Sequence, residues 1–132
     1  MKHWLIKSEP GCYSFDDQER DGVTHWDGVR NYQARNNMKD MKIGDLCFFY
    51  HSINEKQIVG IVKVVKEYYP DPEDERFVWV DVEYFSRLKN PVTLSLVKER
   101  WPELALVKQS RLSVMTVEKE YFEEICKFGD PS

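Results

Sequence analysis

The 132-residue sequence predicts one mixed α/β domain built around a strongly curved sheet or barrel. Short apolar or alternating segments, typical of strands, dominate the chain, and short helical segments lie between and after them. A chain of this length can bury one core without disulfides or a metal. Because no linker, repeat or low-complexity tract divides the sequence, residues 1–132 are expected to form a single domain.

The first part of the chain is predicted to contain one strand and two helices. Residues 4–7 form a short apolar strand. Ser14 and Asp17 have the spacing of a capping box, which predicts a helix over residues 15–20. A second helix is expected after the turn at Asp27-Gly28, because apolar residues then recur at helical spacing.

Three strands are predicted in the middle of the chain. Residues 46–51 are apolar, and residues 57–65 are apolar on both faces, which is typical of a central or barrel-forming strand. Residues 78–84 alternate between apolar and mixed side chains, as on a half-solvated sheet. The acidic stretch that starts at Tyr69-Pro70 is expected to be a loop, and Asn90-Pro91 is expected to end the third strand.

The last part of the chain is predicted to be mostly helical. Thr93 can cap a helix over residues 94–100, which closes before Pro102. Residues 104–112 show no clear period and are expected to be irregular. Thr116 is then expected to cap a final amphipathic helix.

The net charge of −4 is unevenly distributed along the sequence. Residues 67–83 contain seven acidic residues and one basic residue and therefore carry −6, which leaves +2 on the rest of the chain. The remainder can form a local cationic patch. Nonspecific tracking along a duplex is not expected, because it needs many phosphate contacts.

Cysteine spacing and hydropathy indicate the cellular environment. Cys12, Cys47 and Cys126 form no close pair, which favours a reducing cytosolic or nuclear compartment. The first residues are too polar for a signal peptide, and no run approaches the roughly 18 apolar residues of a membrane span. We therefore expect a cytoplasmic protein, or a nuclear one in a eukaryote, without a membrane partner.

The sequence lacks the usual motifs of metal sites and enzymes. The three histidines and three cysteines do not have the short ligand spacings of zinc sites. Cys47 and His51 share a strand face but lie about 13 Å apart, too far for a catalytic dyad. No Gly-rich phosphate loop or nucleophile elbow occurs. We therefore expect no metal, no cofactor and no catalytic residue.

The stretch over residues 26–36 combines an aromatic ring at a turn with a helix rich in hydrogen-bond donors. Asn31 and Arg35, four positions apart, share a polar helical face. An aromatic ring beside amides and a guanidinium suits a flat, partly anionic ligand such as a nucleobase on its phosphate backbone. The alternative is that Trp26 fills the core and the helix face is solvated.

Four motifs lie where predicted strands or helices end, and functional side chains often collect at such positions. They occupy residues 4–10, 26–36, 44–52 and 109–113. In this order, and over nearly the whole chain, they resemble the EVE domain family of the PUA-like superfamily. The resemblance implies a PUA-like β pseudobarrel with surrounding helices. It also implies a non-enzymatic module that takes a modified nucleobase, above all a modified cytosine in DNA, into an aromatic pocket.

Further likeness to the YTH family, which binds methylated adenine in RNA, implies roles for single residues. Lys7, Ser8 and Glu9 would line the base edge, Trp26 would form one wall of the aromatic cage, and Arg111 would hold a phosphate. The full predicted base-binding set is Lys7, Ser8, Glu9, Trp26, Asn31, Tyr50, Ser52, Leu112 and Ser113, and the predicted phosphate-binding set is Arg30, Arg35, Lys108 and Arg111.

These assignments predict a specific geometry. The pocket residues should converge on one cavity, with Trp26 and Arg111 on the same side of the molecule. Positive side chains should gather at the mouth of the cavity, namely Lys7, Arg30, Arg35, Lys39, Lys108 and Arg111. The acidic stretch within residues 67–83 should lie away from the mouth or on its rim. The Trp26 ring should be partly open to solvent, because it precedes a turn outside any apolar run. Tyr50 and Tyr69 are the candidates for a second aromatic wall.

Two other functions remain open from the sequence. A PUA-type RNA-binding module in RNA modification or decay would grip a backbone with Arg35, Lys39 and Lys42, and its binding would fall steeply with salt. An enzyme on a modified nucleotide or small ligand would use Glu9 as a base. The main hypothesis has a nucleic acid carrying a modified base as its partner, and the protein is expected to be a monomer.

Overall fold

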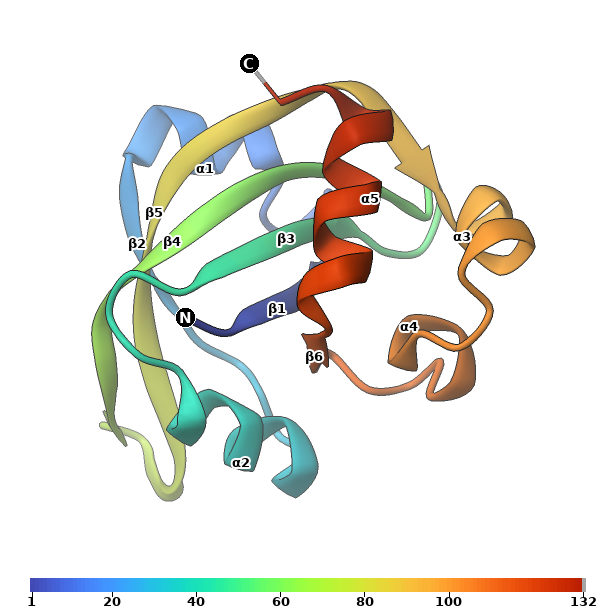
Figure 1. The fold of residues 1–132 in the computed structure, drawn as a ribbon. Helices are drawn as coiled ribbons and strands as arrows, with labels where there is room; N and C mark the ends of the chain where they lie inside the picture. Colours follow the sequence, from blue (N-terminus) through green and yellow to red (C-terminus); the bar gives the residue numbers. More distant parts are fainter. Residues whose placement is uncertain (132) are drawn as a thin grey trace.

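The structure, a computed structural model, describes residues 1–131 and contains one strongly curved, six-stranded sheet with helices around it (Figure 1). The strand order is β2-β5-β4-β3-β1-β6, and all neighbours are antiparallel except β1 and β3. The predicted mixed α/β class with a curved sheet is confirmed. The strands are β1 (His3–Ser8), β2 (Val23–Trp26), β3 (Leu46–His51), β4 (Gln57–Asp71), β5 (Asp74–Thr93) and β6 (Val114–Val117).

Two of the three predicted helix caps are present. The Ser14 hydroxyl accepts from the backbone N–H of Asp17, whose carboxylate accepts from the N–H of Ser14, which completes the capping box. Thr93 likewise caps its helix through the N–H of Leu96. The helices are α1 (Phe15–Asp21), α2 (Tyr32–Asp40), α3 (Leu94–Arg100), α4 (Ala105–Lys108) and α5 (Lys119–Gly129).

The predicted cap at Thr116 is wrong, because this residue belongs to strand β6. Residues 114–117 pair with β1, and three of these four side chains are buried. Pairing and burial therefore outweigh the local capping preference of threonine, and α5 begins only at Lys119. The segment expected to be irregular also contains the short helix α4.

The acidic stretch is not a loop, as predicted, but the end of a long β4–β5 hairpin. Asp71 pairs with Asp74 across the hairpin tip, and the arm extends beyond the rest of the sheet beside α2 (Figure 1). The Asn90-Pro91 step does not end β5 either. Ile58 pairs with Val92 and Gly60 with Arg87, so this step falls in an irregularity of the ladder, where a missing proline N–H is tolerated.

The core packs against both faces of β3 and supports the site described below. Phe48 on β3 stacks on Phe122 of α5, with ring centroids 4.1 Å apart. The next residue of β3, Phe49, packs edge to face against both Phe15 of α1 and Trp26 of β2. Strand β3 therefore connects the packing of α5, α1 and β2.

Candidate functional site

A cavity of about 660 Å³ opens where the end of β1, strand β2 with its following loop, and the residue before β6 meet. This volume is in the range of small-molecule sites. Gly28, with φ of 75°, turns the chain sharply behind Trp26 and lets the next residues form one wall. The predicted residues that line this cavity are Lys7, Ser8, Glu9, Trp26, Arg30 and Ser113.

Trp26 is both a core residue and a wall of the cavity. Its ring packs edge to face on Phe49, with centroids 5.4 Å apart, and it is only 7% exposed. The expectation of a partly open ring is therefore wrong. The reason is that β2, which the local sequence did not predict, pairs Trp26 with Val80 of β5 and holds the ring against the core.

Tyr13 provides the second aromatic ring of the cavity, and the sequence analysis missed it. Its ring lies edge to face with Trp26, at 6.3 Å between centroids and an interplanar angle of 83°. The two candidates named from the sequence lie elsewhere. Tyr50 is buried outside the cavity lining, and Tyr69 packs against Trp79 and donates to Asp81 on the sheet.

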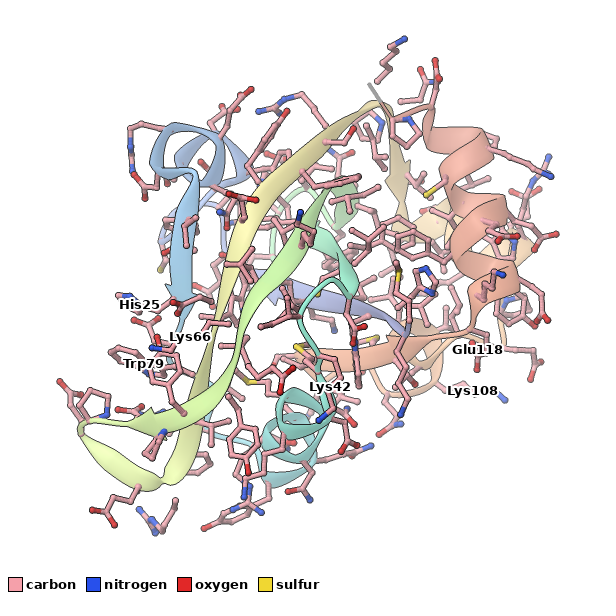
Figure 2. The ribbon with its side chains drawn as sticks, turned by 60° about the vertical axis from the view of Figure 1, so that its left-hand side comes forward. His25, Lys42, Lys66, Trp79, Lys108 and Glu118 are labelled. Carbon is pink, nitrogen blue, oxygen red and sulfur yellow. The ribbon has the colours of Figure 1, made fainter. Side chains whose placement is uncertain are left out.

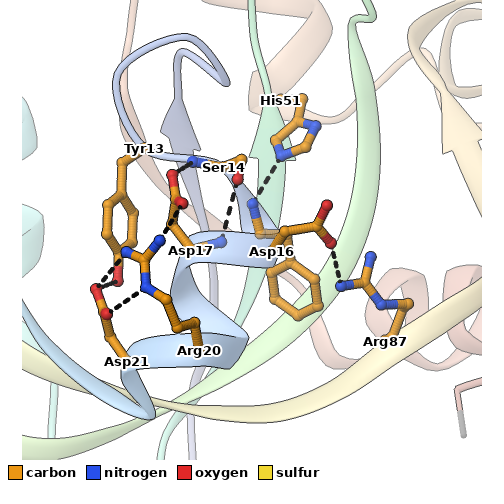
Figure 3. A network of polar contacts seen from close by, with 9 residues as sticks. Tyr13, Ser14, Asp16, Asp17, Arg20, Asp21, His51 and Arg87 are labelled. Carbon is orange, nitrogen blue, oxygen red and sulfur yellow. Dashed lines mark hydrogen bonds and ion pairs between the residues drawn. The ribbon is translucent and has the colours of Figure 1, made fainter.

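The loop that carries Tyr13 is fixed at both ends. The Ser8 hydroxyl donates to the carbonyl of Tyr13, and the carbonyl of Glu9 accepts from the N–H of Tyr13 at 2.9 Å. The Tyr13 hydroxyl donates to Asp21, whose carboxylate also accepts from Arg20 (Figure 3). Burial, and to a lesser extent this donation to Asp21, raise the pKa of Tyr13, so the phenol stays protonated. Ser8 and Glu9 thus present the ring as well as line the cavity.

The start of α1, which directly follows this loop, is anchored to β3 by His51. The Nε2 atom of His51 accepts the N–H of Phe15 at 3.0 Å (Figure 3), and its Nδ1 atom lies 3.1 Å from Glu55. The first contact requires an unprotonated Nε2, so the neutral tautomer with a proton on Nδ1 satisfies both partners. His51 therefore has a structural role and does not reach the cavity lining.

Lys7 places an ammonium group in the cavity without a carboxylate partner among residues 1–131. Its Nζ atom donates to the carbonyl of Ser110 at 2.8 Å and lies 5.8 Å from the centre of the Tyr50 ring. Burial lowers the pKa of Lys7, because no carboxylate compensates for the lost water. A half-buried cation of this kind favours an anionic or strongly hydrogen-bond-accepting ligand.

Asn31 and Arg111 do not enter this cavity but line a neighbouring hollow of about 340 Å³ together with Leu112. The two spaces are adjacent, because Arg30 and Ser113 of the cavity directly precede and follow Asn31 and Leu112 in the chain. The predicted convergence on a single cavity is therefore wrong for Asn31 and Arg111. Trp26 and Arg111 nonetheless belong to the same region of the molecule.

Four other predicted site residues line neither space. Tyr50 is buried, and the N–H of Ser52 donates to the carbonyl of Ser8 behind the cavity. Arg35 donates to the carbonyl of Arg76 on the hairpin. Lys108 pairs with Glu103 and lies far from His25, a residue of the cavity lining (Figure 2).

The cavity mouth is not strongly cationic, contrary to expectation. Lys7 and Arg30 lie there beside the exposed carboxylates of Glu9 and Asp27. Arg30 is also engaged by Asp71, a buried carboxylate of the hairpin, at 3.1 Å. The acidic stretch therefore contacts the rim and neutralises one of the predicted phosphate ligands.

The described part of the chain contains no cluster of three or more side chains of the His, Cys, Asp or Glu type arranged to hold a metal ion. None of the helices between residues 1 and 131 is both long and apolar enough to cross a bilayer.

Comparison with solved structures confirms the PUA-like pseudobarrel fold. A protein from Rhodopseudomonas palustris solved by NMR is 44% identical with a TM-score of 0.93, covering 98% of this chain and 94% of the other. Human THYN1 protein, solved in complex with 5-methylcytosine-containing DNA, is 30% identical with a TM-score of 0.90, covering 100% and 99% of the two chains. An ASCH protein from Zymomonas mobilis is similar in fold alone, with a TM-score of 0.61 at 11% identity.

Sequence comparison also finds thymocyte nuclear protein 1. Thymocyte nuclear protein 1 from chicken is 35% identical over 159 residues, a match that covers 92% of this chain and 66% of the relative. This chain thus spans about two thirds of that relative's length. The family model described as EVE domain matches residues 2–128. The chain therefore belongs to the EVE domain family.

Proposed function

We propose that this protein is a non-enzymatic nucleic-acid-binding module that takes a modified base, flipped out of its strand, into the 660 Å³ cavity. The observation that carries the proposal is the combination of two perpendicular rings, Trp26 and Tyr13, with the unpaired ammonium of Lys7 in one cavity. Aromatic rings bind the faces of a base, and an ammonium group attracts its acceptor atoms or the attached phosphate.

The energetics favour a module of modest affinity. Extruding a base costs a few kcal/mol of stacking. Contact with an aromatic ring returns about 1–3 kcal/mol. Because Trp26 and Tyr13 are held in place before a ligand arrives, little ordering cost is added on binding. A methyl or hydroxymethyl group on the base adds roughly 1–3 kcal/mol, which sets the expected discrimination.

The likeness to human THYN1, whose solved structure contains 5-methylcytosine DNA, supports modified cytosine in DNA as the ligand class. The match covers the whole of this chain and 99% of that chain, so the comparison includes the cavity-forming segments.

The polar groups of the cavity support binding rather than catalysis. The Ser8 hydroxyl is used to hold Tyr13, and His25 stacks on Trp79 with ring centroids 4.3 Å apart (Figure 2). Glu9, the base of the enzymatic alternative, is exposed on the rim, where the thiol of Cys12 contacts its carboxylate. A general base needs its partner within hydrogen-bond reach, and each of these groups is engaged by a different residue instead.

The test is a titration of the protein with oligonucleotides of one sequence that contain cytosine, 5-methylcytosine or 5-hydroxymethylcytosine. We expect tighter binding of a modified form, and we expect Lys7→Met to weaken it about tenfold or more. Lys108→Met is the matched control, because Lys108 pairs with Glu103 away from the cavity. Equal affinity for all forms, or turnover of a modified nucleoside, would overturn the proposal. Binding that ignores modification and falls steeply with salt would favour the RNA-binding alternative.

A further inference from the structure

The hollow beside the cavity has walls from two separate segments. Asn31 and Gln33 at the start of α2 form one wall, and residues 109–112 between α4 and β6 form the other. The cavity and the hollow share a boundary, because the ammonium of Lys7 in the cavity donates to the carbonyl of Ser110 in the hollow. A strand whose base occupies the cavity can therefore continue into this hollow.

Both walls are held in position without using the groups that face a ligand. The Asn31 carboxamide oxygen accepts from the N–H of Ala34 and caps α2. Asn37 on the same helix donates to the carbonyl of Val114 at 2.8 Å, which fastens α2 to β6. On the other wall, the N–H of Leu112 donates to the carbonyl of Gln109 and closes a turn.

The hydrogen-bonding groups of the hollow remain available. The side chains of Gln33, Gln109 and Arg111 are on exposed residues and make no hydrogen bond or ion pair within residues 1–131. No carboxylate belongs to the lining of the hollow, whereas Glu9 and Asp27 belong to that of the cavity. A polyanionic strand is therefore repelled less on the side of the hollow than elsewhere at the cavity mouth.

We propose that this hollow binds the nucleotide next to the flipped base, and that Gln33 and Gln109 read the edge of that neighbouring base. A carboxamide offers a donor and an acceptor side by side, which allows a bidentate contact with a base edge. The guanidinium of Arg111 supplies positive charge at the same place. This inference rests on the proposed function, since it requires a strand that enters the cavity.

The test uses oligonucleotides with one fixed modified cytosine and each of the four bases at the position before or after it. We expect the protein to prefer one neighbouring base by at least about fivefold, the lower limit for a bidentate contact. Gln33→Met and Gln109→Met keep the length of the side chain and remove its hydrogen bonds. They should abolish this preference and leave the ratio of affinities for modified and unmodified cytosine unchanged.

Asn54→Met is the control, because Asn54 is an exposed amide between β3 and β4 that lines neither space. It should retain the preference, and thermal melting should show that all three variants fold. Equal affinity for all neighbouring bases, or a preference that survives in both glutamine variants, overturns the inference while the binding of modified cytosine stands. If the parent protein binds modified and unmodified cytosine equally well, the proposed function itself is wrong.

Discussion

The β4–β5 hairpin and the cavity at the end of β1 are both built from aromatic rings and cations, but they leave these groups in different states. On the hairpin side, Arg30 pairs with Asp71 and Arg76 pairs with Asp74. The Phe77 ring is covered by the Arg30 guanidinium at 5.0 Å. The pairing with Arg76 holds the pKa of Asp74 at about 2. Both arginines of this region therefore have carboxylate partners within the folded chain.

In the cavity, by contrast, one cation and two aromatic rings face open space. Lys7 has no carboxylate partner within residues 1–131, and Trp26 and Tyr13 border open space. The comparison teaches that residue type does not identify a binding surface. What matters is whether a charged group already has a partner of opposite charge in the folded chain, because a cation without one gains more from an anionic ligand.

The largest effect is expected from Trp26→Ala. The ring is buried against Phe49, so its removal should destabilise the protein by about 3–5 kcal/mol and abolish binding together. Thermal melting and oligonucleotide titration of the variant measure the two effects. A variant that melts like the parent would show that Trp26 does not hold the cavity wall in place.

Removing one member of the Arg30–Asp71 ion pair should leave the other charged group without its partner. Asp71→Asn frees the Arg30 guanidinium at the cavity rim, so oligonucleotide affinity should rise and depend more strongly on salt. Arg30→Met leaves a buried carboxylate without its cation, and its melting temperature should fall by about 5 °C. If Asp71→Asn leaves affinity and its salt dependence unchanged, Arg30 does not face the nucleic acid.

The pH dependence of the stability of Asp71→Asn provides a control. The pKa of Asp71 is lowered, first by the backbone N–H of Glu73 and then by Arg30. The ionised form is therefore favoured in the folded state, and its stabilisation is present above the usual aspartate pKa and lost as pH falls through the lowered value. The difference in stability between the parent and Asp71→Asn should shrink in acid, which melting at several pH values can test.

The pKa of Lys7 predicts a smaller effect with the same pH direction but in a more alkaline range. Because burial lowers this pKa, the unfolded chain holds the proton more tightly, and stability should rise with pH between the lowered value and the usual lysine pKa. Affinity for an anionic strand should fall over the same window as the ammonium loses its proton. Lys7→Met should flatten both profiles, and unchanged profiles would mean that Lys7 does not titrate there.

Local patterns in the sequence were enough for much of the fold, since Ser14 and Asp17 signal α1 within four residues. The burial of Trp26 could not be predicted from its neighbours in the sequence. Its burial depends on β5 and on Phe49 of β3, far along the chain. Tyr13 was missed because no motif marks it. Its position between the motif over residues 4–10 and the Ser14 cap was the available signal.

Arg35 and Arg111 also show that contacts between distant segments cannot be predicted from local sequence. Arg35 and Arg111 were both predicted to hold phosphate, and nothing in their neighbours separates them. Arg35 is engaged by the carbonyl of Arg76, 41 positions away, and by the Tyr32 ring at 4.8 Å. Arg111 has no such partner among residues 1–131. Only the pairing of distant segments distinguishes a structural arginine from an available one.

The smallest expected effect comes from substituting Arg35 and Arg111. It distinguishes most directly between binding at the hairpin and binding at the hollow. Arg111→Met should lower the slope of log affinity against log salt by about 1, because one phosphate contact and its released counterion are lost. Arg35→Met should leave the slope unchanged, since its guanidinium is held by the hairpin. Titrations at four or more salt concentrations measure both slopes on the same modified oligonucleotide. If instead Arg35→Met lowers the slope and Arg111→Met does not, the strand runs along α2 and the hairpin. Backbone binding by Arg35, Lys39 and Lys42 would then be favoured over the cavity.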